Sequence, residues 1–351
     1  MDCERCAVVY MPILKGREGE MRAVSRLRNP LTRRMLPIFE VPPTRQGPIK
    51  DAFAFTKKIC RSVPPRMTIA VDAGHLADPD EGQRRPLLDI AEDLAAWGIP
   101  IRPVLHLHDS ADRLAEARKA AAMHTGHVVI RLGGDAADPD DEKAEAQLSL
   151  LCRRAGTTIE EAALVLDFFE VRSARDLGRV EPLARKCVAW ARRYPWETIT
   201  VASGAMPESL ADLPTNTATS IPRHDLALWR RLQEPDIGFG DYGIAHPKMT
   251  VGGWHPTPNL RYTDENVWWI YRRARDGNGN KGMYDLCASL VAADHWPPEG
   301  AAFSWGDAEI ARRAVGHGGP DIATGWRAWG TAHHLTHVLK MLDAGQRGAS
   351  G

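Results

Sequence analysis

Several patterns that would assign this chain to a protein class are missing from its sequence. It contains no run of about 18 consecutive apolar residues, the length that a transmembrane helix needs, so no membrane partner is expected. Its first residues, 1–6, lack the basic and apolar regions of a signal peptide. A phosphate-binding P-loop, a His-Glu-x-x-His pair and a dinucleotide-binding glycine motif are absent as well. The sequence therefore predicts a cytoplasmic protein and leaves its cofactor unknown.

The chain has no excess of positive or negative charge, and it contains few cysteines. The chain has 45 basic and 45 acidic side chains, so no overall positive field exists and general nucleic-acid binding is not expected. Among its 6 cysteines, Cys3 and Cys6 form the one Cys-x-x-Cys pair, whereas a structural zinc ion needs four ligands. His106 and His108, on a predicted strand, should point to opposite faces. No metal site is therefore predicted, and the cysteines are expected to be free intracellular thiols.

What the sequence does contain is an eightfold repeat of an apolar run followed by a helical segment. The runs begin near Ala7, Met35, Met67, Ile101, His127, Ala163, Thr198 and Asp236. Their spacing fits a strand, a crossover helix and two short loops. Eight such units predict a closed (β/α)8 barrel of the TIM type over residues 1–245, with its strands between about 7 and 245. An open doubly wound sheet is the alternative.

The remainder of the chain is rich in tryptophan. Of the 11 tryptophans, eight lie between Trp229 and Trp329, and each is a large group that needs a packing partner. A hairpin is predicted from Leu260–Thr263 and Val267–Arg273, followed by helices near Gly306–Val315 and Trp326–Ala344. Since no linker-like stretch precedes it, residues 246–345 are predicted to be an α+β extension packed on the barrel. Residues 346–351 are predicted to be a disordered tail.

Polar residues follow nearly every predicted strand, where barrels of this type place their chemistry. The predicted catalytic residues are Lys15, Glu40, Asp72, His106, Asp167 and Asp241. The predicted substrate-binding residues are Arg131, Arg223 and Tyr242. Carboxylates can bind a divalent cation or act as acid and base, and histidine transfers protons near neutral pH. The six catalytic residues and Arg131 are expected to face one cavity, with room for an anion between Lys15 and Arg131.

A purely structural interpretation competes with this site. Opposite charges buried at the barrel mouth stabilise only when they pair, so the same residues are also typical of a ring of structural salt bridges. In the extension, His333 and His337 share a helix face, as half of a metal site would. No acidic ligand lies at matching spacing, and packing or capping is the favoured interpretation.

Six short motifs occur in the order found in a known family. They are Y-M-P-I-L-K-G-R-E-G-E at 10–20, M-L-P-I-F-E-V at 35–41, G-F-G-D-Y-G at 238–243, L-R-Y-T at 260–263, F-S-W-G-D-A-E-I at 303–310 and W-R…H-H-L-T-H-V at 326–338. With these motifs the chain resembles the phage beta protein family over nearly its whole length. The matching polar positions are Lys15, Glu18, Glu20, Glu40, Asp241, Tyr242, Arg261, Asp307, His333 and His334. The resemblance implies a role in phage biology or anti-phage defence and assigns no catalytic residue.

Two functional hypotheses follow. The first is an enzyme or ligand-sensing barrel whose mouth takes a phosphorylated or nucleotide-like small molecule, so that an anionic small molecule is the expected partner. The second is a non-catalytic interaction protein whose partner is another protein of a phage-related or defence assembly. Ligand-induced stabilisation distinguishes them, because only a protein with a specific site gains stability from its ligand.

Overall fold

A computed structural model gives the arrangement of residues 8–27, 31–78, 82–133, 144–234, 236–250, 257–274, 277 and 279–349. Within this part of the chain, eight parallel strands lie side by side in chain order. They are β1 (Ile13–Leu14), β2 (Ile38–Glu40), β3 (Ile69–Asp72), β4 (Ile101–Leu105), β5 (Val128–Gly133), β6 (Ala162–Glu170), β7 (Thr198–Gly204) and β9 (Ile237–Gly240). Each of the eight predicted apolar runs overlaps one of these strands. The apolar runs are continuous because such strands are covered on both faces.

The last strand returns to the first and closes the barrel. The Phe239 amide donates to the Val9 carbonyl at 2.9 Å, and the Met11 amide donates to the Phe239 carbonyl at 2.9 Å. The Ile13 amide continues the ladder to the Asp241 carbonyl at 2.7 Å. The prediction of a (β/α)8 barrel is therefore confirmed, and the open doubly wound sheet is excluded.

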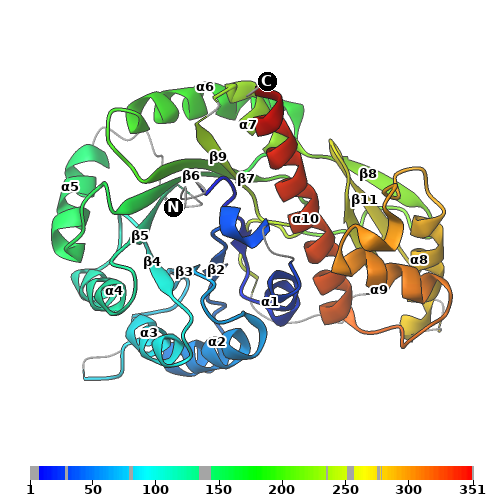
Figure 1. The fold of residues 1–351 in the computed structure, drawn as a ribbon, viewed down its shortest axis with the longest axis horizontal. Coiled ribbons are helices and arrows are strands. Elements are labelled where there is room, and N and C mark those ends of the chain that lie inside the picture. The colour runs from blue at the N-terminus through cyan, green and yellow to red at the C-terminus, as the bar shows by residue number, and fades with distance from the viewer. Residues whose placement is uncertain are drawn as a thin grey trace, which may run out of the picture.

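Helices connect the strands and form an outer layer around them (Figure 1). They are α1 (Glu18–Ser25), α2 (Pro48–Ser62), α3 (Pro86–Ala96), α4 (Ala111–Met123), α5 (Ala144–Ala155), α6 (Ala174–Ala191) and α7 (His224–Leu232). Ser110 caps α4, since its hydroxyl accepts the Arg113 amide, and a capping serine stabilises a helix by about 1 kcal/mol. The predicted start of the fifth helix, with Asp138 as cap and Pro139 as first residue, lies outside the described residues.

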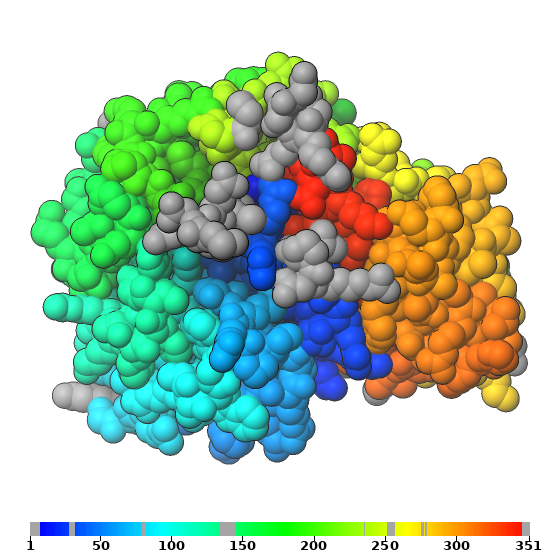
Figure 2. Space-filling model, in the orientation of Figure 1, coloured from blue at the N-terminus to red at the C-terminus, as the bar shows by residue number. Residues whose placement is uncertain are grey.

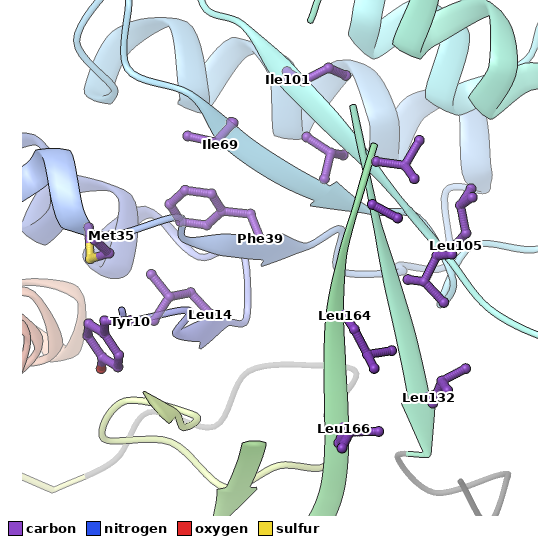
Figure 3. Packing of buried hydrophobic residues seen from close by; sticks show 14 of the residues in the cluster. Tyr10, Leu14, Met35, Phe39, Ile69, Ile101, Leu105, Leu132, Leu164 and Leu166 are labelled. Carbon is purple, nitrogen blue, oxygen red and sulfur yellow. The ribbon is translucent and has the colours of Figure 1, made fainter. Parts of the chain in front are cut away.

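Two hydrophobic layers hold the barrel together. Side chains such as Leu14, Phe39 and Leu164 point outward and pack beneath the helices (Figure 3). Alternate side chains, such as Ile38 and Val165, point inward and fill the barrel interior. Burying one such side chain contributes about 1.5–3 kcal/mol, so the filled interior is a core and not a channel. The barrel therefore leaves space for chemistry at its mouth, beyond the strand ends.

The C-terminal extension is built on a second, three-stranded antiparallel sheet. Its strands are β8 (Ala218–Pro222), β10 (Asn259–Thr263) and β11 (Val267–Arg272), in the order β10-β11-β8. The predicted hairpin is present, but β8 was expected to be a polar loop. This strand is short and lies at the sheet edge, where Ala, Thr and Ser alternate between exposed and half-buried positions, so no apolar run marks it.

Three helices complete the extension: α8 (Gly282–Val291), α9 (Trp305–Ala314) and α10 (Ala323–Ala349). The sequence prediction missed α8, which follows a glycine-rich turn. Helix α10 continues to Ala349, whereas a disordered tail was predicted from Gln346. No helix among the described residues is long and apolar enough to cross a membrane.

Helix α10 lies between the barrel and the rest of the extension (Figures 1 and 2). It crosses α1 closely, because Gly19 has no side chain there. A Cβ atom at Gly19 would lie 2.6 Å from the Thr324 carbonyl oxygen and 3.2 Å from the Arg327 Cβ. Such a close approach of two helices fixes how the extension sits on the barrel.

Candidate functional site

The guanidinium group of Arg131, on β5, is the centre of the barrel mouth. Its Nε and Nη2 donate to Asp167 Oδ2 at 2.9 and 2.7 Å, and its Nη1 donates to Glu40 Oε1 and Asp72 Oδ2, both at 2.8 Å. Nη2 also donates to the Tyr242 hydroxyl at 2.7 Å. These contacts use all five N–H groups that a guanidinium carries. One cation thereby joins β2, β3, β5, β6 and the segment after β9.

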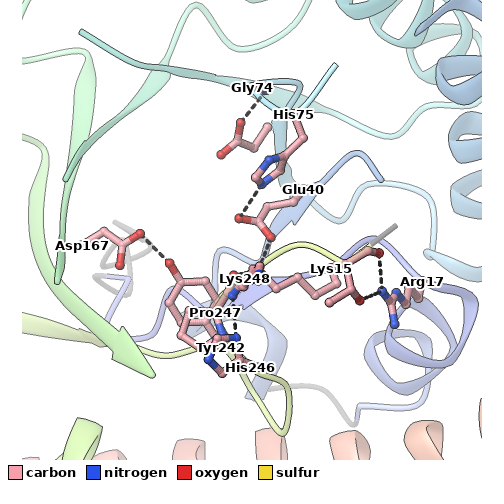
Figure 4. Close-up of polar contacts among 12 residues, drawn as sticks. Lys15, Arg17, Glu40, Gly74, His75, Asp167, Tyr242, His246, Pro247 and Lys248 are labelled. Atoms are coloured by element: carbon pink, nitrogen blue, oxygen red, sulfur yellow. Dashed lines mark hydrogen bonds and ion pairs between the residues drawn. The ribbon is translucent and has the colours of Figure 1, made fainter. Parts of the chain in front are cut away.

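Tyr242 and Lys15 extend this mouth network. The Tyr242 hydroxyl donates to Asp167 Oδ2 at 2.6 Å, and Lys15 Nζ donates to Glu40 Oε2 at 2.6 Å and to the Pro247 carbonyl. The Lys15 ammonium also lies 4.6 Å from the centre of the Tyr242 ring. Figure 4 shows Tyr242 reaching Asp167, and Glu40 lying between Lys15 and His75.

His106, just beyond β4, pairs with a buried carboxylate. Its Nε2 lies 2.9 Å from Asp72 Oδ1, and the same oxygen accepts the Gly74 amide at 2.8 Å. A Cβ atom at Gly74 would lie 2.9 Å from Asp72 Oδ1 and 3.0 Å from His106 Nε2. Glycine at this position therefore leaves room for the His106–Asp72 contact.

A cavity of ≈ 80 Å³ opens beside this pair. Its polar lining comes from Glu40, Asp72, His75, His106, His108 and Arg131. Among the described residues no group of three or more His, Cys, Asp or Glu side chains has the arrangement of a metal site. The carboxylates face Arg131 and Lys15, which already balance them, so proton transfer fits these residues better than cation binding does.

Burial and neighbouring charges set the protonation states of the mouth. Burial alone would raise the pKa of Glu40, but Lys15 and Arg131 outweigh it and lower that pKa to about 2. Burial also opposes ionisation of Asp72, yet His106 and Arg131 hold its pKa well below the usual value. Conversely, Asp72 overcomes burial and raises the pKa of His106. Ionised carboxylates therefore face a histidine that holds its proton more tightly than usual.

Tyr242 stays a neutral phenol in this setting. Burial raises its pKa well above the usual value, and Asp167 and Glu40 raise it further against the opposing effect of Arg131. The hydroxyl can therefore donate to Asp167 while it accepts from Arg131.

Not every residue predicted for the mouth lies there. The structure brings together Lys15, Glu40, Asp72, His106, Arg131, Asp167 and Tyr242. Asp241 does not join them, because its carboxylate lies within hydrogen-bond distance of the Tyr10 hydroxyl and of His334 Nε2 instead. Arg223 likewise lies away from the cavity, close to Asp241. For these two residues the predicted location was wrong.

Asp241 instead belongs to a second buried group, which we name the interface cluster: Tyr10, Arg223, Asp225, Asp241, Thr263 and His334. The Tyr10 hydroxyl donates to Asp241 Oδ1 at 2.8 Å, and His334 Nε2 lies 2.8 Å from Asp241 Oδ2. His334 Nδ1 lies 2.8 Å from the Thr263 hydroxyl. The cluster therefore links the barrel to the sheet and the last helix of the extension.

The histidines of α10 also have structural partners. His333 Nδ1 lies 3.0 Å from Asp307 Oδ2, and its Nε2 lies 2.8 Å from the Thr263 carbonyl oxygen. Its ring stacks on Tyr262 at 3.8 Å between centroids and lies 5.9 Å from the ring of His337. Packing and hydrogen bonding, the interpretation favoured from the sequence, describe this pair.

The region between Lys15 and Arg131, where an anion was predicted, holds a side chain of the protein in this structure. Arg131 has no N–H left for a ligand, and the ring of Tyr242 lies near both cations, 4.6 Å from Lys15 Nζ and 5.8 Å from Arg131 Cζ. Tyr242 was predicted to bind substrate, yet here it fills this part of the mouth. The cavity is lined on its other side by His75, His106 and His108.

Sequence reasoning also missed part of that histidine side. His106 and His108 were expected on opposite faces of a strand, but β4 ends at Leu105. Both residues therefore lie in the following loop, where the alternation of a strand does not apply, and their ring centres are 5.5 Å apart. His75 lies 3.3 Å from Glu40 Oε1, and its position shortly after β3 was the available signal.

These features define a (β/α)8 barrel protein with a closed charge network and a small histidine-lined cavity at its mouth. A family model described as "Beta protein" matches residues 10–340, so the chain belongs to the Beta protein family. No curated protein sequence matches it. Among solved structures it is similar to the biosynthetic arginine decarboxylase SpeA from Campylobacter jejuni, with 10% identity and a TM-score of 0.34. That match covers 96% of this chain and 56% of the decarboxylase, and a likeness at this level carries no statement about activity.

Proposed function

We propose that the cavity at the barrel mouth binds a small polar molecule and that His106 transfers a proton to or from it. The observation that carries this proposal is the position of His106, which lines the cavity while buried Asp72 holds its ring. A carboxylate in this position fixes the orientation of an imidazole and stabilises its protonated form. His106 with a raised pKa is suited to act as a general acid near neutral pH.

The shape of the cavity limits what can enter it. Sites for drug-sized ligands usually occupy about 300–1,000 Å³, so a cavity of ≈ 80 Å³ accepts only the headgroup of a larger molecule. His75, His106 and His108 line it, and the raised pKa of His106 keeps a proton on its ring that favours an anionic headgroup. These features support a phosphorylated or nucleotide-like ligand. A setting in phage biology or anti-phage defence is part of the proposal and rests on the family alone.

His106→Gln tests the proposal. Thermal unfolding would be followed with and without inorganic phosphate and a panel of mononucleotides and sugar phosphates. We expect at least one compound to raise the Tm of the wild type, and His106→Gln to lose that rise. Its own Tm should stay within about 4 °C, which corresponds to roughly 3 kcal/mol or less for a chain of this size. His317→Gln, an exposed histidine of the extension, is the matched control and should keep the full response.

A non-catalytic interaction protein is the second candidate function. The closed network around Arg131 supports it, because charges that are all paired with one another stabilise a barrel without any ligand. Lys15→Met and Asp167→Asn separate the two candidates. Lower stability of both variants, with every compound of the panel inert on the wild type, would favour the interaction protein. A ligand response that these variants abolish at little cost in Tm would favour the site.

A further inference from the structure

A cleft of ≈ 750 Å³ lies on the extension, between its sheet and the C-terminal end of α8. Small side chains create it. Ala218 on edge strand β8 is paired with Tyr271 on β11, and Ser220 is paired with Trp269, so the aromatic rings have no large neighbour on that side. The chain after α8 adds two further small side chains, Ala292 and Ala293. The cleft thus follows from the sequence of two separate segments.

One wall of this cleft is aromatic and held in place. The rings of Trp269 and His295 stack with centroids 4.3 Å apart and planes 7° from parallel. The Tyr271 hydroxyl lies 2.7 Å from His295 Nε2, and Trp269 Nε1 donates to Asp264 Oδ2 at 3.1 Å. Burial lowers the pKa of His295, so this wall carries no positive charge near neutral pH. An aromatic ring carries the negative side of its quadrupole on its faces.

The rim of the cleft is negative. Asp264 and exposed Asp294 supply two carboxylates from two separate segments, the turn after β10 and the chain after α8. The C-terminal end of α8 adds the negative end of a helix dipole, since Ser289 and Ala292 also line the cleft. No lysine or arginine is among the described residues that line it.

We propose that this cleft binds an organic cation, a guanidinium or ammonium group placed against the aromatic wall between the two carboxylates. Aromatic faces attract such cations, most strongly when the cation is partly desolvated, and carboxylates hold a guanidinium with paired hydrogen bonds. The group belongs either to a free small molecule or to a basic side chain of a partner peptide. The cleft lies apart from the barrel mouth, so this inference does not depend on the proposed function.

The test uses the full-length protein and two probes of the same shape. N-acetyl-arginine amide carries the guanidinium, and N-acetyl-citrulline amide replaces it with a neutral urea. Binding would be measured by calorimetry and by quenching of tryptophan fluorescence. We expect the arginine compound to bind at least about 10-fold more tightly than the citrulline compound, and more weakly as salt is raised. Equal binding of the two compounds, or none by either, would overturn the proposal.

Variants then locate the binding. Asp294→Asn removes an exposed carboxylate of the rim and should weaken binding of the arginine compound about 3- to 10-fold. Asp93→Asn, which removes an exposed carboxylate from α3 of the barrel, is the matched control and should leave the Kd unchanged. Trp269→Leu should abolish binding, and circular dichroism shows whether this half-buried change still folds. An Asp294→Asn variant with an unchanged Kd would refute the assignment even if Trp269→Leu does not fold.

A peptide arm identifies the source of the cation. A five-residue peptide with a central arginine, blocked at both ends, would be compared with the free arginine amide. Binding of the peptide about 10-fold tighter or more supports a partner protein, whose backbone would lie along the exposed edge strand β8. Equal affinity supports a free small molecule. Both results support a cation site in the cleft. If the arginine amide binds and the peptide does not, the ligand is a free small molecule.

Discussion

The mouth network and the interface cluster are both buried groups of charges, yet they differ in how completely they are paired. Every N–H of Arg131 in the mouth has an acceptor within 2.9 Å. In the interface cluster, Arg223 Nη2 lies 3.8 Å from Asp241 and 4.0 Å from Asp225. Within the described part of the chain, Arg223 Nε and Nη2 and both carboxylate oxygens of Asp225 have no hydrogen-bond partner.

This difference shows where each group obtains its geometry. The partners of Arg131 in the mouth are mostly strand residues: Glu40, Asp72 and Asp167, like Arg131 itself, lie on strands of one barrel, whose register brings them within hydrogen-bond distance. The interface cluster gathers Asp225 from α7, Asp241 from the end of β9 and His334 from α10, so its geometry depends on how separate elements pack. Because the pairing is incomplete, Asp225 titrates near neutral pH. Burial raises its pKa to about 7, Arg223 opposes this rise and Asp241 adds to it.

The largest loss of stability is expected when the C-terminal extension is separated from the barrel. We expect residues 246–351, expressed alone, to show no cooperative unfolding transition. They lack strand β8, helix α7 and the surface of α1 against which α10 packs, and the tryptophans of the fragment would be left without a packing partner. Circular dichroism during thermal unfolding measures this, with the whole chain as control. A sharp transition of the fragment would show that the extension is an independent domain.

The second largest loss of stability is expected when the central arginine of the mouth network or of the interface cluster is replaced. Arg131→Met leaves Glu40, Asp72 and Asp167 buried with less compensating charge, so we expect it to lower the free energy of unfolding by about 3–5 kcal/mol. Arg223→Met should cost less, since Arg223 has no close carboxylate bond to lose and Asp225 can take up a proton. Urea unfolding of both variants at neutral pH measures the difference. Equal losses would show that the pairing seen in the mouth adds nothing to stability.

The pKa of Asp225 predicts a pH dependence that the carboxylates Glu40 and Asp72 of the mouth do not share. Its folded pKa of about 7 exceeds the unfolded value of 3.8, so protonation of Asp225 favours the folded state. This contribution is fully present below pH 4 and is lost as the pH rises through about 7. Asp225→Asn imitates the protonated acid. Relative to the wild type, the variant should therefore gain stability from pH 5 to pH 8, on the order of a few kcal/mol.

The carboxylates of the mouth should show the opposite dependence of stability on pH. The pKa of Glu40 is lowered to about 2, so its stabilising contribution is present above pH 4.5 and lost only as the pH falls toward 2. The contribution of Glu40 is constant between pH 5 and 8, so it cancels when Asp225→Asn is compared with the wild type. Asp93→Asn is the exposed control. A difference between Asp225→Asn and wild type that stays flat over this range would contradict the raised pKa.

The mouth could be foreseen from the sequence largely because the fold itself decides it. Once eight apolar runs define parallel strands, residues such as Lys15, Glu40 and Asp72 must meet at the strand ends. Arg131 and Asp167 follow by the same rule even though 36 positions separate them. No knowledge of loop structure is needed for these residues, and the structure brings all of them together.

Residues beyond the strand ends could not be placed in this way. Whether Asp241 or Tyr242 faces the barrel depends on the phase of the chain after β9, which composition does not reveal. His75 and His108 reach the cavity from loops, where side-chain direction has no fixed period. Strand β8 escaped detection because an exposed edge strand of small polar residues has the composition of a loop. The pairing of Arg223 and Asp225 depends on contacts between elements far apart in the chain.

Two tyrosine hydroxyls, one in each buried group, provide the finest comparison and the smallest expected effect. Tyr242→Phe removes an acceptor of Arg131 and a donor to Asp167, and hydrogen bonds to charged groups contribute about 1.5–3 kcal/mol. Tyr10→Phe removes one donor to Asp241, which keeps His334 and the Gly243 amide. We expect the first change to cost about 2 kcal/mol and the second about 1 kcal/mol, measured by urea unfolding at constant pH. A larger loss for Tyr10→Phe would mean that the interface cluster, despite its unpaired groups, is the more tightly coupled of the two.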